Sequence, residues 1–306
     1  MKLLLSIVQH RYSDTLILDK FIVTNILIMT IKLKVPATAR LVLDAAAKIY
    51  DSPSERLYIS KIDTEEVSDL LQCLLAAYPL FREMVFYRKQ SVRDLLQKRM
   101  QQYPLQQVLI LGAGLDPLSL LIIEKYKDRI SNIFEIDNGY IEEKEKIYEN
   151  ILQGDTTVQF IRCDVTDTSQ LDAQLRQYDF RADLPTLIIF EGLIYYITNE
   201  EFINTMQLFS SVDHRNMLLL DFMLTRDDIP AYHLHYYNDI IKVIEKVLNI
   251  KLNITSRLTI TEMAAALNAS QVEFISLYET ARRLLGENHV FRERGDGFLE
   301  MAVFSL

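Results

Sequence analysis

The chain of 306 residues contains no tryptophan and only two cysteines, Cys73 and Cys163. The cysteines form no CxxC pair, and no group of cysteines and histidines has the spacing of metal ligands. The pattern argues against a disulfide framework and a structural zinc site, so the sequence predicts no bound metal. Few, isolated cysteines are typical of proteins of the reducing cytoplasm, where we expect this chain to act.

Long hydrophobic runs are also lacking. Phe21 to Ile31 is mostly apolar, but it is shorter than the roughly 18 residues that a membrane-spanning helix needs. Met1 to Ile7 is not followed by the small residues of a signal-peptide cleavage site. The sequence therefore predicts no membrane partner. We expect residues 1–35 to lie on the main domain as a peripheral segment; the alternative is that Met29 is the true start.

A surplus of basic residues is absent as well, since the formal charge is −9 at pH 7. A negative chain without a basic face is repelled by a phosphate backbone, so we expect no nucleic-acid partner. Apolar residues make up 49% and charged residues 25% of the chain, as in ordinary globular proteins. The length suits one elaborated α/β domain or two unequal domains. The oligomeric state is not indicated.

The stretch from Gln107 to Ser119 organises the rest of the chain. Val108 to Leu111 is a short apolar run, typical of a strand buried on both faces of a parallel sheet. The next residues, Gly112-Ala113-Gly114, have little or no side chain, so the backbone there can take positive φ and approach a ligand closely. Asp116-Pro117 predicts a helix start, with aspartate as the N-cap. Strand, glycine turn and helix in this order predict the first βα unit of a nucleotide-binding sheet.

Helices are predicted before this unit, and strands alternate with helices after it. In an N-terminal segment and helical cap, residues 1–104, helices are predicted at Val35–Arg56 (closed by Pro53), Asp63–Ala77 and Phe81–Gln102. In the core, residues 105–306, parallel strands are predicted at 133–137, 158–163, 186–190 and 217–222, with helices at 140–152, 171–178 and 199–211.

The pattern loosens beyond Thr225, where a lid insertion is predicted at about 225–270. It would hold a long aromatic loop at 227–238, with helices at 239–248 and 259–267. An antiparallel strand pair at 272–278 and 298–306 would complete the sheet. The predicted fold class is α/β: a doubly wound, Rossmann-like, seven-stranded and mostly parallel sheet with a helical cap and a lid.

Distinctive groups follow four of the predicted strands. They are the turn Gly112-Ala113-Gly114 and the carboxylates Asp137, Asp164 and Glu191. Because the carboxyl ends of parallel strands share one edge, we expect these groups to lie together where a ligand binds. A dinucleotide would favour fewer acids and a third glycine, which is missing here. A nicotinamide-dependent dehydrogenase is therefore the weaker alternative.

A cationic cofactor without phosphate fits the acids better, and S-adenosylmethionine is such a molecule. Asp137 would accept hydrogen bonds from its ribose hydroxyls. Asp164 and the adjacent Val165 would bind the adenine, the carboxylate at the exocyclic amine and the valine on the ring face. Glu191 would lie near the positively charged methionine end.

The segments FYRKQSVRDLL, LILGAGLD, FEID, CDV and LPTLIIFEGLIYYIT occur in this order between Phe86 and Phe222. Their succession resembles the leucine carboxyl methyltransferase family of S-adenosylmethionine-dependent enzymes. The resemblance implies that Arg88 binds the cofactor carboxylate and that Gly112 lies beside the methionine moiety. It also implies a basic residue in the first helix, for which Arg40 is the nearest match.

The acceptor of the methyl group is not settled by the sequence. The expected function is O-methylation of a carboxylate or hydroxyl on a small molecule, such as a natural-product intermediate. Methylation of a protein C-terminal carboxylate and a fold-bearing module without activity are the alternatives. A carboxylate needs no base, whereas a hydroxyl does. His233 and His235 are the candidate bases, and Tyr195 and Glu191 are candidates to line the reaction centre.

Overall fold

The computed structural model describes residues 33, 37–63, 68–286 and 290–306. The expectations for residues 1–32, including the two possible starts, lie outside the described residues. Leu33 forms an isolated parallel bridge with Ile62. Among the described residues, no helix is both long and apolar enough to cross a bilayer.

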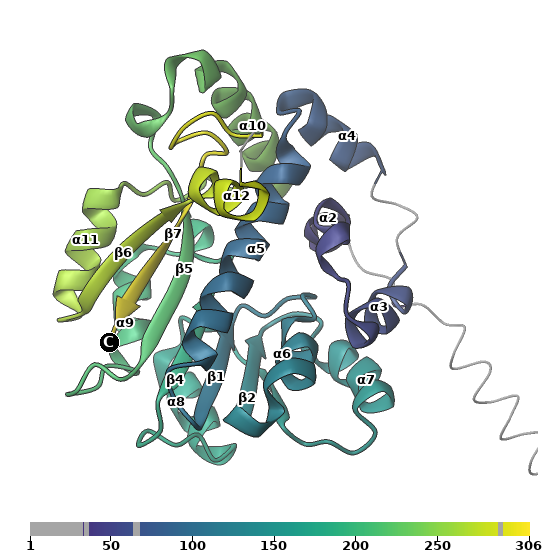
Figure 1. The fold of residues 1–306 in the computed structure, drawn as a ribbon, viewed down its shortest axis with the longest axis vertical. Helices are drawn as coiled ribbons and strands as arrows, with labels where there is room; N and C mark the ends of the chain where they lie inside the picture. Colours follow the sequence, from purple (N-terminus) through teal and green to yellow (C-terminus); the bar gives the residue numbers. More distant parts are fainter. Residues whose placement is uncertain (1–32, 34–36, 64–67, 287–289) are drawn as a thin grey trace, which may run out of the picture.

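A sheet of seven strands forms the centre of the described structure (Figure 1). Its order is β3-β2-β1-β4-β5-β7-β6. The pairs among β1 to β5 are parallel, and β7 runs antiparallel to both of its neighbours. The strands span Gln106–Leu111 (β1), Ile130–Asp137 (β2), Val158–Arg162 (β3), Thr186–Phe190 (β4), Met217–Met223 (β5), Ser270–Ser276 (β6) and Leu299–Ser305 (β7). The predicted α/β fold class, including the closing antiparallel pair, is confirmed.

The α-helices divide into a cap and the crossovers of the sheet. The cap contains Ala37–Ala45 (α2), Pro53–Ser60 (α3), Ser68–Ala77 (α4) and Phe81–Met100 (α5). The others are Leu118–Tyr126 (α6), Ile141–Leu152 (α7), Thr168–Gln177 (α8), Asn199–Gln207 (α9), Leu234–Leu248 (α10), Arg257–Ala266 (α11) and Leu277–Leu285 (α12). Figure 1 shows α5 running along the sheet, with α2 and α4 on one side of it and α3 close to α6 and α7.

β1 is buried along its whole length, as its unbroken apolar run predicts. Val108 and Ile110 share a core cluster with residues of α5 and α6 on one face of the sheet. Leu109 and Leu111 share the other cluster with residues of α8 and α9. The glycine turn at the end of β1 therefore starts from a strand that is fixed on both faces.

The predicted single helix from Val35 to Arg56 is wrong. The chain forms α2, a 3₁₀ turn over Ala47–Ile49, and then α3. Pro53 begins α3 rather than closing a helix, because Ser52 and Glu55 form a capping box around it. The Ser52 side chain accepts a hydrogen bond from the Glu55 amide, and the Glu55 side chain accepts one from the Ser52 amide.

Two predictions in the C-terminal part are also corrected. The loop predicted at 227–238 consists of two 3₁₀ turns, Arg226–Asp228 and Ala231–His233, and α10 already begins at Leu234. The strand predicted to reach Tyr278 ends at Ser276, where a capping box with Glu279 starts the unpredicted helix α12.

A buried ion pair ties α7 to β2 below the glycine turn. Lys144 Nζ lies 2.5 Å from Glu135 Oε2, and both side chains are completely buried. Lys144 also donates to the main-chain oxygen of Asp116 at 2.6 Å, and Ser119 donates to Glu135. Burial raises the pKa of Glu135, while Lys144 lowers it. The pair thus connects β2 and α7 with the turn that leads into α6.

We predict that Glu135→Gln reduces the free energy of unfolding by about 3–5 kcal/mol, because it leaves the Lys144 ammonium buried without a counter-charge. Asp172→Asn is the matched control, since it breaks an exposed i,i+4 pair with Arg176 and should change stability by less than about 0.5 kcal/mol. Urea unfolding of both variants measures the difference. Equal stabilities would show that the buried pair does not hold this region together.

Candidate cofactor and acceptor site

Three adjoining cavities open at the carboxyl edge of the parallel strands. The outer polar cavity, about 420 Å³, is lined by Asp137, Asp164 and Val165 among others. The inner polar cavity, about 280 Å³, is lined by the glycine turn, Arg88 and Glu191. The apolar cavity, about 130 Å³, is lined mainly by residues of the cap and α10. Tyr196 lines all three cavities, so they lie next to one another.

Asp137 is held by the backbone in the outer polar cavity. Its Oδ2 accepts a hydrogen bond from the Gly114 amide and its Oδ1 one from the Gly139 amide, both at 2.8 Å. Each carboxylate oxygen can accept more than one hydrogen bond. The Asp137 side chain is thus held in place, and its two oxygens can still accept hydrogen bonds from a ligand.

Asp164 and Val165 follow β3 at the far side of the same cavity. Asp164 Oδ1 accepts hydrogen bonds from the Thr166 amide at 2.9 Å and the Thr166 hydroxyl at 2.8 Å. The Asp164 side chain is exposed, whereas Val165 is buried. An exposed acceptor beside a buried apolar side chain is an arrangement that can bind the edge and the face of an adenine ring.

The glycine turn forms the wall between the two polar cavities. Gly112 has φ +68°, and a Cβ on it would lie 2.9 Å from Leu193 Cδ2. An alanine there would be strained and would collide with Leu193, so the sequence needs glycine. Ala113 is buried and lines the inner polar cavity.

The N-cap role predicted for Asp116 is wrong. The α6 helix begins at Leu118, and no side chain caps it. Asp116 instead binds Lys89 of α5 and accepts a hydrogen bond from the Tyr50 hydroxyl at 3.3 Å. The Asp116 carboxylate thus binds Lys89, a residue distant in the sequence, instead of capping α6.

A cluster of five charged side chains lies beneath the inner polar cavity: Arg88, Lys89, Asp116, Glu191 and Asp221. Arg88 Nε and Lys89 Nζ each lie 3.0 Å from Glu191 Oε1. Arg88 Nη1 lies 3.5 Å from Asp221 Oδ2. Burial raises the pKa of Asp221, although Arg88 opposes the shift. With three carboxylates and two cations, this charge cluster favours a cationic ligand.

Lys89 and Asp221 are site residues that the sequence reasoning missed. Lys89 stands next to Arg88 in the segment FYRKQ, and Asp221 interrupts the apolar strand MLLLDFM. An acid inside a fully buried strand is the signal that could have identified Asp221, because buried carboxylates are retained only with partners.

Arg40, the basic residue that the family resemblance implies, is buried in α2. Its Nε and Nη2 atoms have no hydrogen-bond partner in the described structure. The residue lines none of the three cavities, although its neighbour Val42 lines two of them. A buried guanidinium with unused donors fits a site that receives an anionic group.

The two histidines are not brought to the site, since neither lines any of the three cavities. His233 Nδ1 lies 3.1 Å from Asp296 Oδ1, and its ring packs against Tyr78 and Phe298. Burial lowers the pKa of His233. His235 is exposed on α10. The geometry therefore does not support the hypothesis that either imidazole is a general base.

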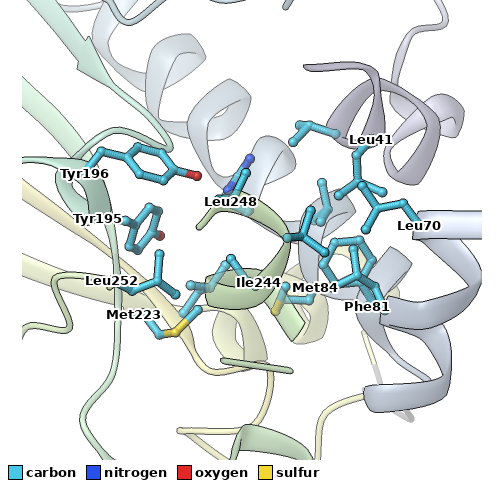
Figure 2. Close-up of a pocket in the computed structure, with 16 residues that line it drawn as sticks. Leu41, Leu70, Phe81, Met84, Tyr195, Tyr196, Met223, Ile244, Leu248 and Leu252 are labelled. Atoms are coloured by element: carbon cyan, nitrogen blue, oxygen red, sulfur yellow. The ribbon is translucent and has the colours of Figure 1, made fainter. Parts of the chain in front are cut away.

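Tyr195, by contrast, lines the apolar cavity (Figure 2). Its hydroxyl donates to Asp221 Oδ2 at 2.5 Å. The walls come from the cap, α10 and the ends of two strands; Figure 2 labels Leu41, Leu70, Phe81, Met84, Met223, Ile244, Leu248 and Leu252 among them. Among the described residues that line this cavity, Arg88, Tyr195 and Tyr196 are the ones with polar groups.

The family model described as leucine carboxyl methyltransferase matches residues 30–210. The chain belongs to the leucine carboxyl methyltransferase family. The predicted resemblance is thereby confirmed, and S-adenosylmethionine is the cofactor. A nicotinamide-dependent dehydrogenase, the weaker alternative, is excluded by this membership.

Two solved structures are similar in fold to this member of the family. One is a provisionally assigned methyltransferase from Thermobifida fusca, with 15% identity, coverage of 87% of this chain and 93% of that one, and a TM-score of 0.58. The other is a protein of the DUF574 family from Streptomyces avermitilis, with 11% identity, coverage of 88% and 96%, and a TM-score of 0.58. At these identities the likeness supports the fold alone. No curated protein sequence matches the chain at a significant level.

Proposed function

We propose that this methyltransferase transfers the methyl group to an oxygen atom of a small, apolar acceptor. The observation that carries the proposal is the junction of the cavities. Arg88 and Val42 line both the inner polar and the apolar cavity, so the two cavities are neighbours, and the proposal places the cofactor in one and the acceptor in the other. The apolar walls suit the body of the acceptor, and the three polar residues suit a single polar group on it.

The proposed cofactor placement follows the chemistry of the polar cavities. Asp164 and Val165 would bind the adenine, and Asp137 the ribose hydroxyls. The turn Gly112-Ala113-Gly114 would pass close to the methionine moiety, as its low bulk allows. Arg88 would bind the cofactor carboxylate, and Arg40 of α2 is the further cation that the family resemblance implies. Glu191 would offset the positive charge at the reaction centre.

Bound S-adenosylmethionine supplies a methyl group on a sulfonium, which is a good leaving group. The protein then has to position the acceptor oxygen in line and exclude water. The cap provides the exclusion, because side chains of α2, α4 and α10 cover the apolar cavity. The experiment that follows distinguishes a small-molecule acceptor from the alternative acceptor, the C-terminal carboxylate of a protein.

The test is a transfer assay with methyl-labelled S-adenosylmethionine and four sets of small probes: alkylphenols, alkyl carboxylic acids, alkylamines and alkylthiols. We expect labelled product from an oxygen acceptor only. A methyl ester releases labelled methanol in mild base and a methyl ether does not, which separates carboxylates from hydroxyls. Labelling of amines or thiols alone would contradict the proposal. Labelling of a carboxyl-terminal peptide in preference to every small probe would favour the protein acceptor.

We predict that Asp137→Ala lowers the affinity for S-adenosylhomocysteine by about 2–4 kcal/mol, because hydrogen bonds to a charged acceptor are lost. Calorimetric titration measures the affinity, and a melting curve of the same variant checks that the fold is kept. Asp172→Ala, at the exposed pair on α8, is the control and should bind as the wild type does. An unchanged affinity in Asp137→Ala would remove this residue from the proposed ribose site.

A further inference from the structure

The cofactor placement proposed above does not use Tyr195, which lines the apolar cavity, or its partner Asp221. Tyr195 lies in the 3₁₀ turn Ile194–Tyr196 after β4, and Figure 2 shows its ring at the cavity. Its hydroxyl donates to Asp221 Oδ2 at 2.5 Å. Asp221 Oδ1 accepts a hydrogen bond from the Gly192 amide at 2.6 Å. A phenol at the acceptor cavity is therefore backed by a fully buried carboxylate held on both oxygens.

The charges around this pair argue against an anionic acceptor. The cation shared with the acceptor cavity, Arg88, lies 3.0 Å from Glu191 and 3.5 Å from Asp221. An acceptor carboxylate would have to compete for one guanidinium with these two carboxylates and with the cofactor carboxylate that Arg88 is proposed to bind. A neutral hydroxyl meets no such cost, and it can donate its hydrogen bond to the Tyr195 oxygen. Burial raises the pKa of Asp221 and so favours its taking up a proton, while the contact with Arg88 opposes that shift.

We propose that Tyr195 and Asp221 form a proton relay, and that the natural acceptor carries a weakly acidic hydroxyl, a phenol or an enol, on an apolar skeleton. The proposal rests on the O-methyl transfer proposed above and names its substrate class. Tyr195 is then the catalytic residue that contacts the acceptor, and Asp221 acts through it.

The step balances without any further reactant. The acceptor oxygen forms a bond to the methyl carbon as the carbon–sulfur bond breaks, and that electron pair stays on sulfur, which becomes a neutral thioether. The hydroxyl proton passes to Tyr195 Oη, and the proton of Tyr195 passes to Asp221 Oδ2. Asp221 ends as a neutral carboxylic acid, which loses its proton to water after the product leaves.

The acidity of the acceptor follows from the relay. A phenol or enol has a pKa near the ordinary tyrosine value of about 10. Burial and the neighbouring Asp221 raise the pKa of the Tyr195 hydroxyl well above that value, so Tyr195, once it has passed its own proton to Asp221, is basic enough to take the proton of such an acceptor. An aliphatic alcohol is far less acidic than a phenol, so its proton is taken less readily.

The experiment compares two probes, 4-propylphenol and 4-propyl-2-nitrophenol. The second is largely ionised at a mildly basic assay pH and needs no base. Tyr195→Phe should lower kcat for 4-propylphenol by about 10²-fold or more, with little change in KM or in the affinity for S-adenosylhomocysteine. The ionised nitrophenol is an anion, so the wild type should methylate it more slowly than 4-propylphenol, and Tyr195→Phe should show the same low rate as the wild type on this probe. Asp221→Asn should show the same selective loss.

Tyr237→Phe is the matched control. Tyr237 is also buried, and its hydroxyl donates to the main-chain oxygen of Leu224 at 2.7 Å, but it does not line the apolar cavity. This variant should keep both rates. Equal losses on the two probes in Tyr195→Phe, or no transfer to either phenol by the wild type, would overturn the relay. If carboxylic acids alone are methylated, the relay fails while O-methyl transfer stands; if only nitrogen or sulfur is methylated, the proposed function fails as well.

Discussion

The ion pairs that join α5 to the ends of the central strands are the interaction on which the site depends. Arg88 and Lys89 are consecutive residues of one helix, yet they contact carboxylates that follow β1 and β4 and one inside β5. The helix of the cap is thereby fixed to the edge of the sheet where ligands bind. Replacing Arg88 would leave Asp221 without its cation, and replacing Lys89 would do the same to Asp116, so each cation of the arrangement is needed.

The sheet and the cap form different parts of the site. The strand ends supply backbone turns and carboxylates, which bind a polar and positively charged cofactor. The cap supplies the apolar walls through α2, α4 and α5, and α10 completes them. Since α4 and α10 pack on each other, the acceptor cavity is assembled from segments far apart in the sequence. The polar part of the site is formed by the ends of the parallel strands, whereas the acceptor cavity depends on the particular side chains of the helices that cover it.

Local sequence patterns predicted the strands of the sheet well, but they predicted the contacts between distant side chains poorly. The prediction of a strand at 186–190 has the observed bounds, because a short unbroken apolar run between polar residues favours a strand that is buried on both faces of a parallel sheet. Pro53 and Asp116 were misread because capping and ion pairing use the same residue types. Asp116 has a partner in α5 and Ser52 forms its own capping box. Lys89 and Asp221 carry no motif, since their significance arises only when α5 crosses the sheet. The candidate cofactor residues on the strand ends follow from topology, which the alternation of elements reveals.

The most direct test of this account is a crystal structure of the protein with S-adenosylhomocysteine bound. The account predicts that the ligand spans the two polar cavities, with its ribose at Asp137 and its sulfur facing the apolar cavity between Arg88 and Tyr196. The relay pair Tyr195 and Asp221 should then lie on the acceptor side of the sulfur. A ligand bound elsewhere, or bound with its sulfur turned away from the apolar cavity, would contradict the central claim.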